Sequence, residues 1–337
     1  MTSKIGLAVF GMGKMGLEHV RNILRSPHAA LRWIVRENVE QARALTSSYN
    51  LDTRCETPAN AQKAIEDPNV EAVLIVSPSS THEDLITRSL NAGKAVFCEK
   101  PLTTSIQSTR ACYDLAEQKN KPLFCAFHRR FDPSHFSIYQ QIRTGSTGPV
   151  RIVKSTSRDF SHPPIEYVKT SGGIFRDSTI HDLDMGGWII GSRPTSVFAH
   201  GHAHKEELKA ASDNDQVVVI VTYENGAISV IVNGRWCPFG YDQRLEVLCE
   251  KMQLSVENRG ANHVVSGTNQ GMLQSAPEAN FMRRYPEAYA NELEHFLDVL
   301  EGKDELRVTR RDTIQAMRLA DMCYESLRTK TAVPYTD

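Results

Sequence analysis

Apolar runs and amphipathic stretches alternate along the first 125 residues of the chain. Short runs such as residues 5–10 are apolar throughout, which is typical of strands buried on both faces of a sheet. The sequence predicts strands at residues 5–10, 31–35, 73–76, 95–98 and 123–126, and helices at residues 16–26, 39–49, 82–92 and 105–119. Because strands that alternate with helices are joined by right-handed crossovers, we predict a doubly wound parallel sheet of the α/β class.

The pattern changes after about residue 150, where strand-like segments follow one another with few helices between them. Glu224-Asn225-Gly226 is a turn signal that predicts a hairpin. Residues 217–221 are apolar throughout, so we expect this strand to be covered on both faces. The sequence predicts strands at residues 151–158, 195–204, 215–223, 227–236 and 243–249, helices at residues 286–300 and 309–327, and a long polar loop at residues 258–276. This order predicts an α+β domain with a mainly antiparallel sheet.

Composition narrows the class of protein. The 337 residues carry a formal net charge of −1, which gives no general attraction to nucleic acid or to an anionic membrane. No apolar run approaches the roughly 20 residues that span a bilayer. The seven cysteines are scattered and never spaced as CxxC, so we expect free thiols in a reducing cytoplasm and no metal site.

A glycine motif follows the first predicted strand and opens the first predicted helix. Gly11-Met12-Gly13-Lys14-Met15-Gly16 is a GxGxxG sequence in the order that a dinucleotide-binding turn requires. Gly11 permits the tight turn, Gly13 lets the backbone approach a pyrophosphate, and Gly16 lets helix and strand pack closely. We therefore predict a Rossmann dinucleotide-binding domain over residues 1–125. Residues 126–337 are then the predicted substrate-binding and oligomerisation domain.

The residues at the end of the second strand bear on the choice between NAD and NADP. Arg36 stands where an acidic residue would bind the ribose hydroxyls of NAD, and a guanidinium there suits a 2′-phosphate. Glu37, one position later, can still bind a ribose. The sequence therefore leans slightly toward NADP and leaves NAD open.

The ordered motifs resemble those of the glucose–fructose oxidoreductase/inositol dehydrogenase/rhizopine catabolism (Gfo/Idh/MocA) family. They are the glycine turn, then Ser77-Pro78-Ser79-Ser80-Thr81-His82, then Glu99-Lys100-Pro101. The segment from Ser171 to Met185, with Ser157-Arg158-Asp159 and Arg284-Tyr285, is most similar to the inositol 2-dehydrogenase branch. The resemblance implies that Ser77, Pro78, His82, Glu99 and Lys100 lie at the cofactor. It also implies a metal-free NAD(P)-dependent dehydrogenase that acts on CH–OH donors of a cyclic polyol.

Asp177 and His181 lie four residues apart in a segment that is predicted to be helical, so they share one face. A carboxylate one turn from an imidazole can fix its tautomer and raise its basicity. Taken alone, the pair is more typical of a helix N-cap followed by a core histidine than of a catalytic pair. With Lys100, it predicts a catalytic trio: His181 as base, Lys100 on the reacting oxygen, and Asp177 orienting His181. The resemblance implies the same trio.

Other candidates for substrate contact are Arg129, Asp159, Tyr285 and Tyr289, since a polyol needs several donors and acceptors. Arg130 and Asp132 are more typical of a structural ion pair with each other. His82 is expected either to cap its helix or to line the cofactor cleft.

Three classes of function remain open. They are a polyol or pyranose dehydrogenase or reductase, a glycoside hydrolase that uses the nicotinamide transiently, and a dinucleotide-binding redox sensor. The alternating His200, His202 and His204 are more typical of a solvated sheet face than of a metal site. One free face of the antiparallel sheet, if apolar, predicts a homodimer or homotetramer.

Overall fold

The computed structural model describes residues 4–336, which form two compact units. The first unit contains the described residues up to Phe131 together with Glu287–Ile314. The second unit contains Asp132–Pro286 and the described residues from Gln315 onward. Residues 287–314, which the sequence prediction placed in the second domain, are thus part of the first unit.

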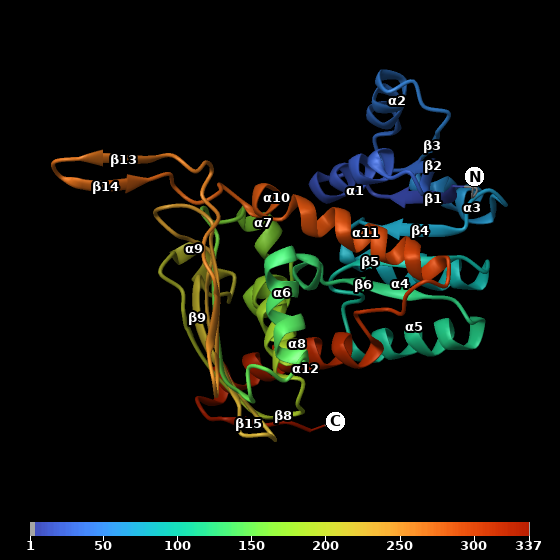
Figure 1. Ribbon diagram of the computed structural model, residues 1–337. Coiled ribbons are helices and arrows are strands. Elements are labelled where there is room, and N and C mark those ends of the chain that lie inside the picture. The colour runs from blue at the N-terminus through green and yellow to red at the C-terminus, as the bar shows by residue number, and fades with distance from the viewer. Residues whose placement is uncertain (1–3, 337) are drawn as a thin grey trace. The chain divides into compact units, whose positions relative to one another are not determined.

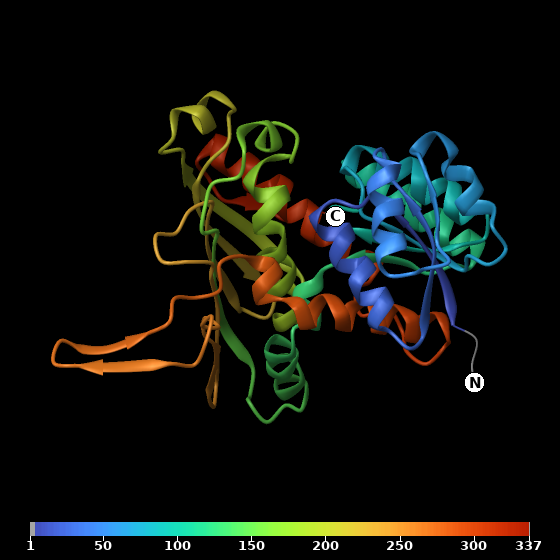
Figure 2. The same cartoon turned by 90° about the horizontal axis from the view of Figure 1, so that it is seen from above.

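The first unit is built on a six-stranded parallel sheet in the order β3-β2-β1-β4-β5-β6. Its strands are β1 (Ile5–Phe10), β2 (Ala29–Val35), β3 (Arg54–Glu56), β4 (Ala72–Ile75), β5 (Ala95–Glu99) and β6 (Leu123–Ala126). Its helices are α1 (Lys14–Arg25), α2 (Val39–Ser48), α3 (Ala61–Glu66), α4 (His82–Asn91), α5 (Ile106–Lys119) and α11 (Pro286–Leu300), whose first residue belongs to the second unit. Helices lie on both faces of the sheet (Figures 1 and 2). The predicted doubly wound parallel sheet is confirmed.

The order of these strands fixes where a ligand can bind. Strands β1 and β4 are neighbours, although β2 and β3 lie between them in sequence and extend the sheet from β1 in the other direction. Doubly wound sheets bind their ligands at such a reversal, outside the carboxyl ends of the two strands, which are β1 and β4 in this sheet. The glycine turn follows β1 and Ser77 follows β4, so both motifs lie at this switch point.

The second unit is built on a seven-stranded sheet in the order β12-β11-β7-β10-β9-β8-β15. Only the β7–β10 pair is parallel among the described pairs, which confirms the mainly antiparallel sheet. Its strands are β7 (Val150–Arg158), β8 (Pro194–His202), β9 (Gln216–Tyr223), β10 (Ile228–Gly234), β11 (Asp242–Cys249), β12 (Gln253–Val256) and β15 (Val333–Pro334). The predicted turn at Gly226 joins β9 to β10, with φ +80° at the glycine.

One face of this sheet is covered by helices and the other is bare. The longer helices of the unit are α6 (Pro133–Arg143), α8 (Ile180–Ile190) and α12 (Arg310–Thr329), whose first five residues belong to the first unit. They lie on the same face of the sheet (Figure 1). Val217, Val219 and Val221 of β9 point to that side and are at most 2% exposed. Val218 and Ile220 are 43% and 38% exposed. The prediction that both faces of β9 are covered is therefore wrong within this chain, because the apolar run alternates between a buried and a solvent-facing side.

A hairpin replaces the long loop that was predicted for residues 258–276. It consists of β13 (Val265–Thr268) and β14 (Gly271–Gln274), which pair only with each other. The hairpin extends away from the seven-stranded sheet (Figures 1 and 2). Its apolar side chains Met272 and Leu273 are 72% and 65% exposed. Sequence reasoning missed it because its polar and small residues give no apolar alternation.

No helix in residues 4–336 combines the length and hydropathy that crossing a membrane requires. All seven cysteines are free thiols, and six of them are buried.

Candidate functional site

The glycine turn between β1 and α1 has the geometry of a phosphate cradle. Gly11 has φ +98°, and a Cβ atom there would lie 2.6 Å from the Val76 carbonyl oxygen. A Cβ at Gly16 would lie 2.4 Å from the Gly11 carbonyl oxygen, so neither position admits a side chain. A Cβ at Gly13 would meet no atom within 4 Å. The first two glycines therefore shape the turn, and Gly13 leaves its backbone open to a ligand.

A cavity of about 500 Å³ begins at this turn and is lined by Met12, Gly13, Arg36 and residues of α2. Gly13 is the N-cap of α1, so no side chain satisfies the N–H groups of the first turn. An N-terminus of this kind attracts phosphate through its free N–H groups and its dipole. The residues present therefore fit the phosphates and adenosine of a dinucleotide. Met15 is half-buried in the first turn of α1, and Glu37 is exposed beyond Arg36.

His82 joins the two other motifs of the first unit. It is 1% exposed at the start of α4, and its ring nitrogens lie 3.0 Å from the Pro101 carbonyl oxygen and 2.9 Å from that of Ser77. The loop after β4, which contains Pro78, is thus tied to the loop after β5 that carries Lys100. The peptide bond between Lys100 and Pro101 is cis. His82 does not cap α4, because the N-cap position is occupied by Thr81. A place for His82 in the cofactor cleft stays a prediction.

A buried acidic cluster lies directly behind Lys100. Glu99 Oε1 is 3.0 Å from the Nε2 atom of His19, and Glu99 Oε2 accepts the Lys100 N–H at 3.3 Å. Glu292 of α11 completes a group whose potential ligand atoms lie within 4.8 Å of one another. Burial, followed by the charge of Glu99, raises the pKa of Glu292 well above its ordinary value, so its carboxyl keeps its proton. The resemblance implies metal-free chemistry, so the absence of a metal site remains our expectation.

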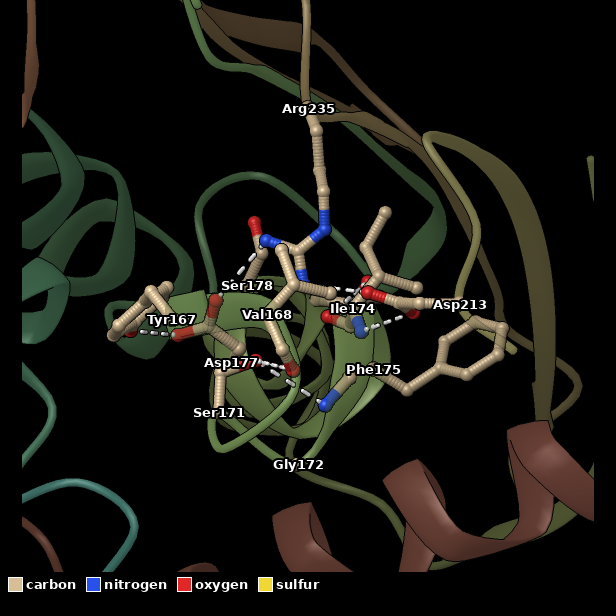
Figure 3. A network of polar contacts seen from close by, with 12 residues as sticks. Tyr167, Val168, Ser171, Gly172, Ile174, Phe175, Asp177, Ser178, Asp213 and Arg235 are labelled. Carbon is tan, nitrogen blue, oxygen red and sulfur yellow. Dashed lines mark hydrogen bonds and ion pairs between the residues drawn. The ribbon is translucent and has the colours of Figure 1, made fainter. Parts of the chain in front are cut away.

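In the second unit, Asp177 lies in a π-helical segment, Phe175–Thr179, that leads into α8. Its Oδ1 accepts a hydrogen bond of 2.7 Å from the Tyr167 hydroxyl, and its Oδ2 accepts one of 3.1 Å from Arg235 Nη1 (Figure 3). Asp177 is not the N-cap of α8, because that position is occupied by Thr179. π-Helical turns inside helices often mark functional sites. His181 follows in the first turn of α8 and is 8% exposed.

Gly172 and Gly173, just upstream of this segment, allow another part of the chain to approach closely. A Cβ at Gly173 would lie 2.1 Å from the Tyr324 hydroxyl oxygen. That hydroxyl donates to the Gly172 carbonyl at 2.8 Å and accepts the Phe175 N–H at 3.3 Å. The two glycines therefore let α12 fix the start of the segment that bears Asp177.

The candidates for substrate contact differ in accessibility. Asp159 is half-buried just beyond β7. Arg129 is 6% exposed, Tyr289 is 2% exposed, and Tyr285 is 1% exposed with its hydroxyl donating to Gln243 Oε1 at 3.3 Å. Of the four residues, Asp159 is thus the most open to a ligand within its own unit.

Arg130 and Asp132 are structural, as expected, but they are not each other's partners. Arg130 is 2% exposed and pairs with Asp312 at 3.1 Å. Asp132 pairs with Arg284 at 2.8 Å and caps α6 through the N–H groups of Ser134 and His135. The prediction of a mutual pair is wrong because the cap and the distant arginine satisfy Asp132.

Sequence reasoning missed Arg235, Asp213 and Tyr167 as partners of the Asp177 segment. Arg235 and Asp177 are 58 positions apart, so no local pattern connects them. One available signal was an arginine at the end of an apolar strand, because a buried guanidinium requires carboxylate partners. His200, His202 and His204 are exposed, and in the described part of the chain they form no group with the spacing of metal ligands.

Comparison with known proteins accounts for nearly the whole chain. Residues 5–127 match the GFO_IDH_MocA family, described as an oxidoreductase family with an NAD-binding Rossmann fold. Residues 139–335 match GFO_IDH_MocA_C, the C-terminal alpha/beta domain of that oxidoreductase family.

Individual relatives cover the same length. The chain is 36% identical to an inositol 2-dehydrogenase of Rhizobium meliloti, covering 99% of both chains. It is 33% identical to a myo-inositol 2-dehydrogenase of Thermotoga maritima, covering 97% of both. A solved scyllo-inositol dehydrogenase of Lactobacillus casei with bound NAD(H) and scyllo-inositol superposes with a TM-score of 0.89 at 26% identity, covering 98% of both chains.

Proposed function

Because this chain belongs to the Gfo/Idh/MocA family of NAD-dependent oxidoreductases, we propose that it oxidises one secondary alcohol of a cyclic polyol, myo- or scyllo-inositol, to the ketone. The observation that carries the proposal is the full-length match to relatives named inositol 2-dehydrogenases. A pyranose is the second candidate, since its ring offers a similar rim of hydroxyls.

We assign three residues to the reaction. When bound, the nicotinamide supplies the acceptor for the hydride. His181 accepts the proton of the reacting hydroxyl, and Lys100 hydrogen-bonds its oxygen and stabilises the negative charge that develops there. Asp177 orients His181 and the substrate hydroxyls. The hydrogen bond from the backbone N–H of Lys100 to the Glu99 carboxylate supports a fixed position for this residue. The buried position of His181 supports its role as a base.

The assignment is tested by Lys100→Ala and His181→Ala. Each is expected to lower kcat by about 100-fold or more, because a positioned acid–base group contributes that much. The dissociation constant of the dinucleotide, measured by fluorescence titration, should change little. Turnover near that of the unchanged protein in either variant would contradict the assignment.

The substrate is tested with a panel of cyclic polyols and pyranoses, each with both cofactors. We expect the highest kcat/KM for myo- or scyllo-inositol and net reduction of the added cofactor. A higher kcat/KM for a pyranose would favour the second candidate. Cleavage of a glycoside without net reduction would instead indicate a hydrolase.

We propose NAD as the cofactor, since the lean toward NADP that Arg36 suggested has no support from the relatives. Arg36 lines the same cavity as Gly13, where a guanidinium can stack on adenine without contacting a 2′-phosphate. We expect a higher kcat/KM with NAD than with NADP, and a higher KM for NAD in Arg36→Ala. A preference for NADP that is lost in Arg36→Ala would contradict this choice.

We further propose that Arg129, Asp159 and Tyr285 contact the polyol. We also propose that the protein acts in the cytoplasm and that it assembles as a homodimer or homotetramer through the bare sheet face. The free thiols support a reducing compartment.

A further inference from the structure

Arg235 is a buried guanidinium that bridges two carboxylates. It follows β10 directly, and its side chain is 1% exposed. Its Nη1 donates to Asp177 Oδ2 at 3.1 Å, and its Nη2 donates to Asp213 Oδ2 at 2.9 Å (Figure 3). Burial by itself would lower the pKa of Arg235, but Asp177 and Asp213 outweigh it and raise the pKa. The guanidinium therefore remains charged.

Both carboxylates are also held at their other oxygen. Asp213 Oδ1 accepts the Ile174 N–H at 2.9 Å, just before the π-helical segment. Asp177 Oδ1 accepts the Tyr167 hydroxyl at 2.7 Å. The contacts in Figure 3 thus connect α7 (Ile165–Val168), the start of the π-helical segment, the loop before β9 and the end of β10. Four separate parts of the second unit converge on one ion-paired group.

The two ends of the network differ in accessibility. Arg235 is 1% exposed and Asp213 is 4% exposed, whereas Asp177 is 13% exposed. The cation thus lies behind Asp177, which keeps one edge accessible. Other titratable or charged groups at the network are Tyr167, Asp159, Tyr324, Arg176, His162, Lys205 and Asp215. Burial, followed by the charge of Asp177, raises the pKa of Tyr167, so its phenol remains a donor.

We propose that Arg235 is a positioning residue that holds Asp177 as an anion in one orientation and thereby leaves proton acceptance to His181. The inference rests on the proposed dehydrogenase function, which it deepens by separating the role of Asp177 from that of His181. With Arg235 in place, Asp177 is an oriented acceptor for a substrate hydroxyl or for the imidazole. Without it, Asp177 and Asp213 would face the same buried space.

Two carboxylates that share a buried space cannot both remain ionised, so one of them binds a proton at a pH nearer neutrality. Arg235→Met should therefore move the acidic limb of the pH profile of kcat/KM to higher pH and make it steeper. At pH 7 we expect kcat/KM to fall by about 10-fold or more, with a higher KM for the polyol and an unchanged dissociation constant for NAD.

A second substitution separates charge from packing. In Arg235→Met/Asp213→Asn only one carboxylate remains, so Asp177 ionises again and the acidic limb should return toward that of the unchanged protein. A purely structural Arg235 would give no such return. Arg151→Met is the matched control, because Arg151 pairs with Glu250 at 3.6 Å on the surface with side-chain exposures of 55% and 50%. An acidic limb that is unchanged in Arg235→Met, or that stays displaced in the double variant, overturns the proposal.

A measurement without turnover keeps the result independent of the proposed function. In Arg235→Met the melting temperature should fall further below that of the unchanged protein at pH 8 than at pH 5, since one of the two carboxylates that lose the guanidinium takes up a proton at the lower pH. A deficit that is equal at both pH values contradicts the proposal, even if no polyol is oxidised. If Arg235→Met does not fold, the double variant should fold, because it lacks the second buried carboxylate; failure of both to fold would mark Arg235 as structural.

Discussion

At the scale of single residues, burial controls the charge of side chains in each of the two units. Glu292 is 0% exposed, and neither of its carboxyl oxygens has a hydrogen-bond partner among the described residues. Arg235 is equally buried but has two carboxylate partners. An isolated buried acid becomes neutral, whereas a paired buried cation stays charged.

The neutral state of Glu292 makes stability depend on pH. Its pKa is raised in the folded protein, so its stabilising contribution is complete below the ordinary pKa of about 4.5 and is lost as the pH rises toward the folded value. Glu292→Gln removes this titration. We expect its melting temperature, relative to the unchanged protein, to be higher at pH 8 than at pH 5. The free-energy difference should change by up to about 1.4 kcal/mol per pH unit.

The half-buried Glu294 lies on the same helix, and Glu294→Gln should show no such trend. A Glu292→Gln variant whose relative stability is the same at both pH values would show that Glu292 is ionised in the folded protein.

At the scale of elements, predictability followed the strength of the local pattern. The fully apolar β1 and β4 and the glycine turn were predicted within one residue, since buried parallel strands leave a continuous apolar signal. The three-residue β3 and the six-residue α3 were missed because they are too short to show a period. The π-helical segment at Asp177 was predicted as ordinary helix, because the local pattern of apolar and polar residues gives no sign of a π turn.

The glycine pair before that segment allows a matched test. Both residues have positive φ, +82° at Gly172 and +78° at Gly173. A Cβ at Gly172 would make contacts of 3.5 Å, so Gly172→Ala should cost about 1–2 kcal/mol of strain. Gly173→Ala adds the clash with Tyr324 and should lower the free energy of unfolding further, as measured by urea denaturation. Equal losses in the two variants would show that the Tyr324 contact is unimportant.

At the scale of the whole molecule, the bare face of the seven-stranded sheet is the main unexplained surface. Two pairs of neighbouring strands, β8–β9 and β7–β11, with β10 between the pairs, carry apolar side chains that are each 38–43% exposed: Phe198, Val218, Ile220, Ile152 and Leu248. Contiguous apolar patches of this kind mark association sites, and homo-oligomers are the commonest way to cover them.

We therefore expect light scattering to give the mass of a dimer or tetramer. The double variant Val218→Lys/Ile220→Lys should reduce the mass, because each lysine would bury a charge in the contact. Tyr49→Lys, at a residue of the first unit that is 54% exposed, is the control and should leave the mass unchanged. A monomeric mass for the unchanged protein would contradict this assembly.

The discontinuous make-up of the first unit has a consequence during synthesis on the ribosome. Phe296 of α11 packs against Phe97 and Phe124, with ring centroids 5.7 Å and 6.0 Å apart. These aromatic side chains of β5 and β6 leave the ribosome long before α11 is translated. The apolar surface of the nascent sheet therefore stays exposed until α11 is synthesised. Chains in this state aggregate or bind chaperones. A fragment that ends at residue 131 should consequently precipitate or bind a hydrophobic dye, although it contains the complete glycine turn.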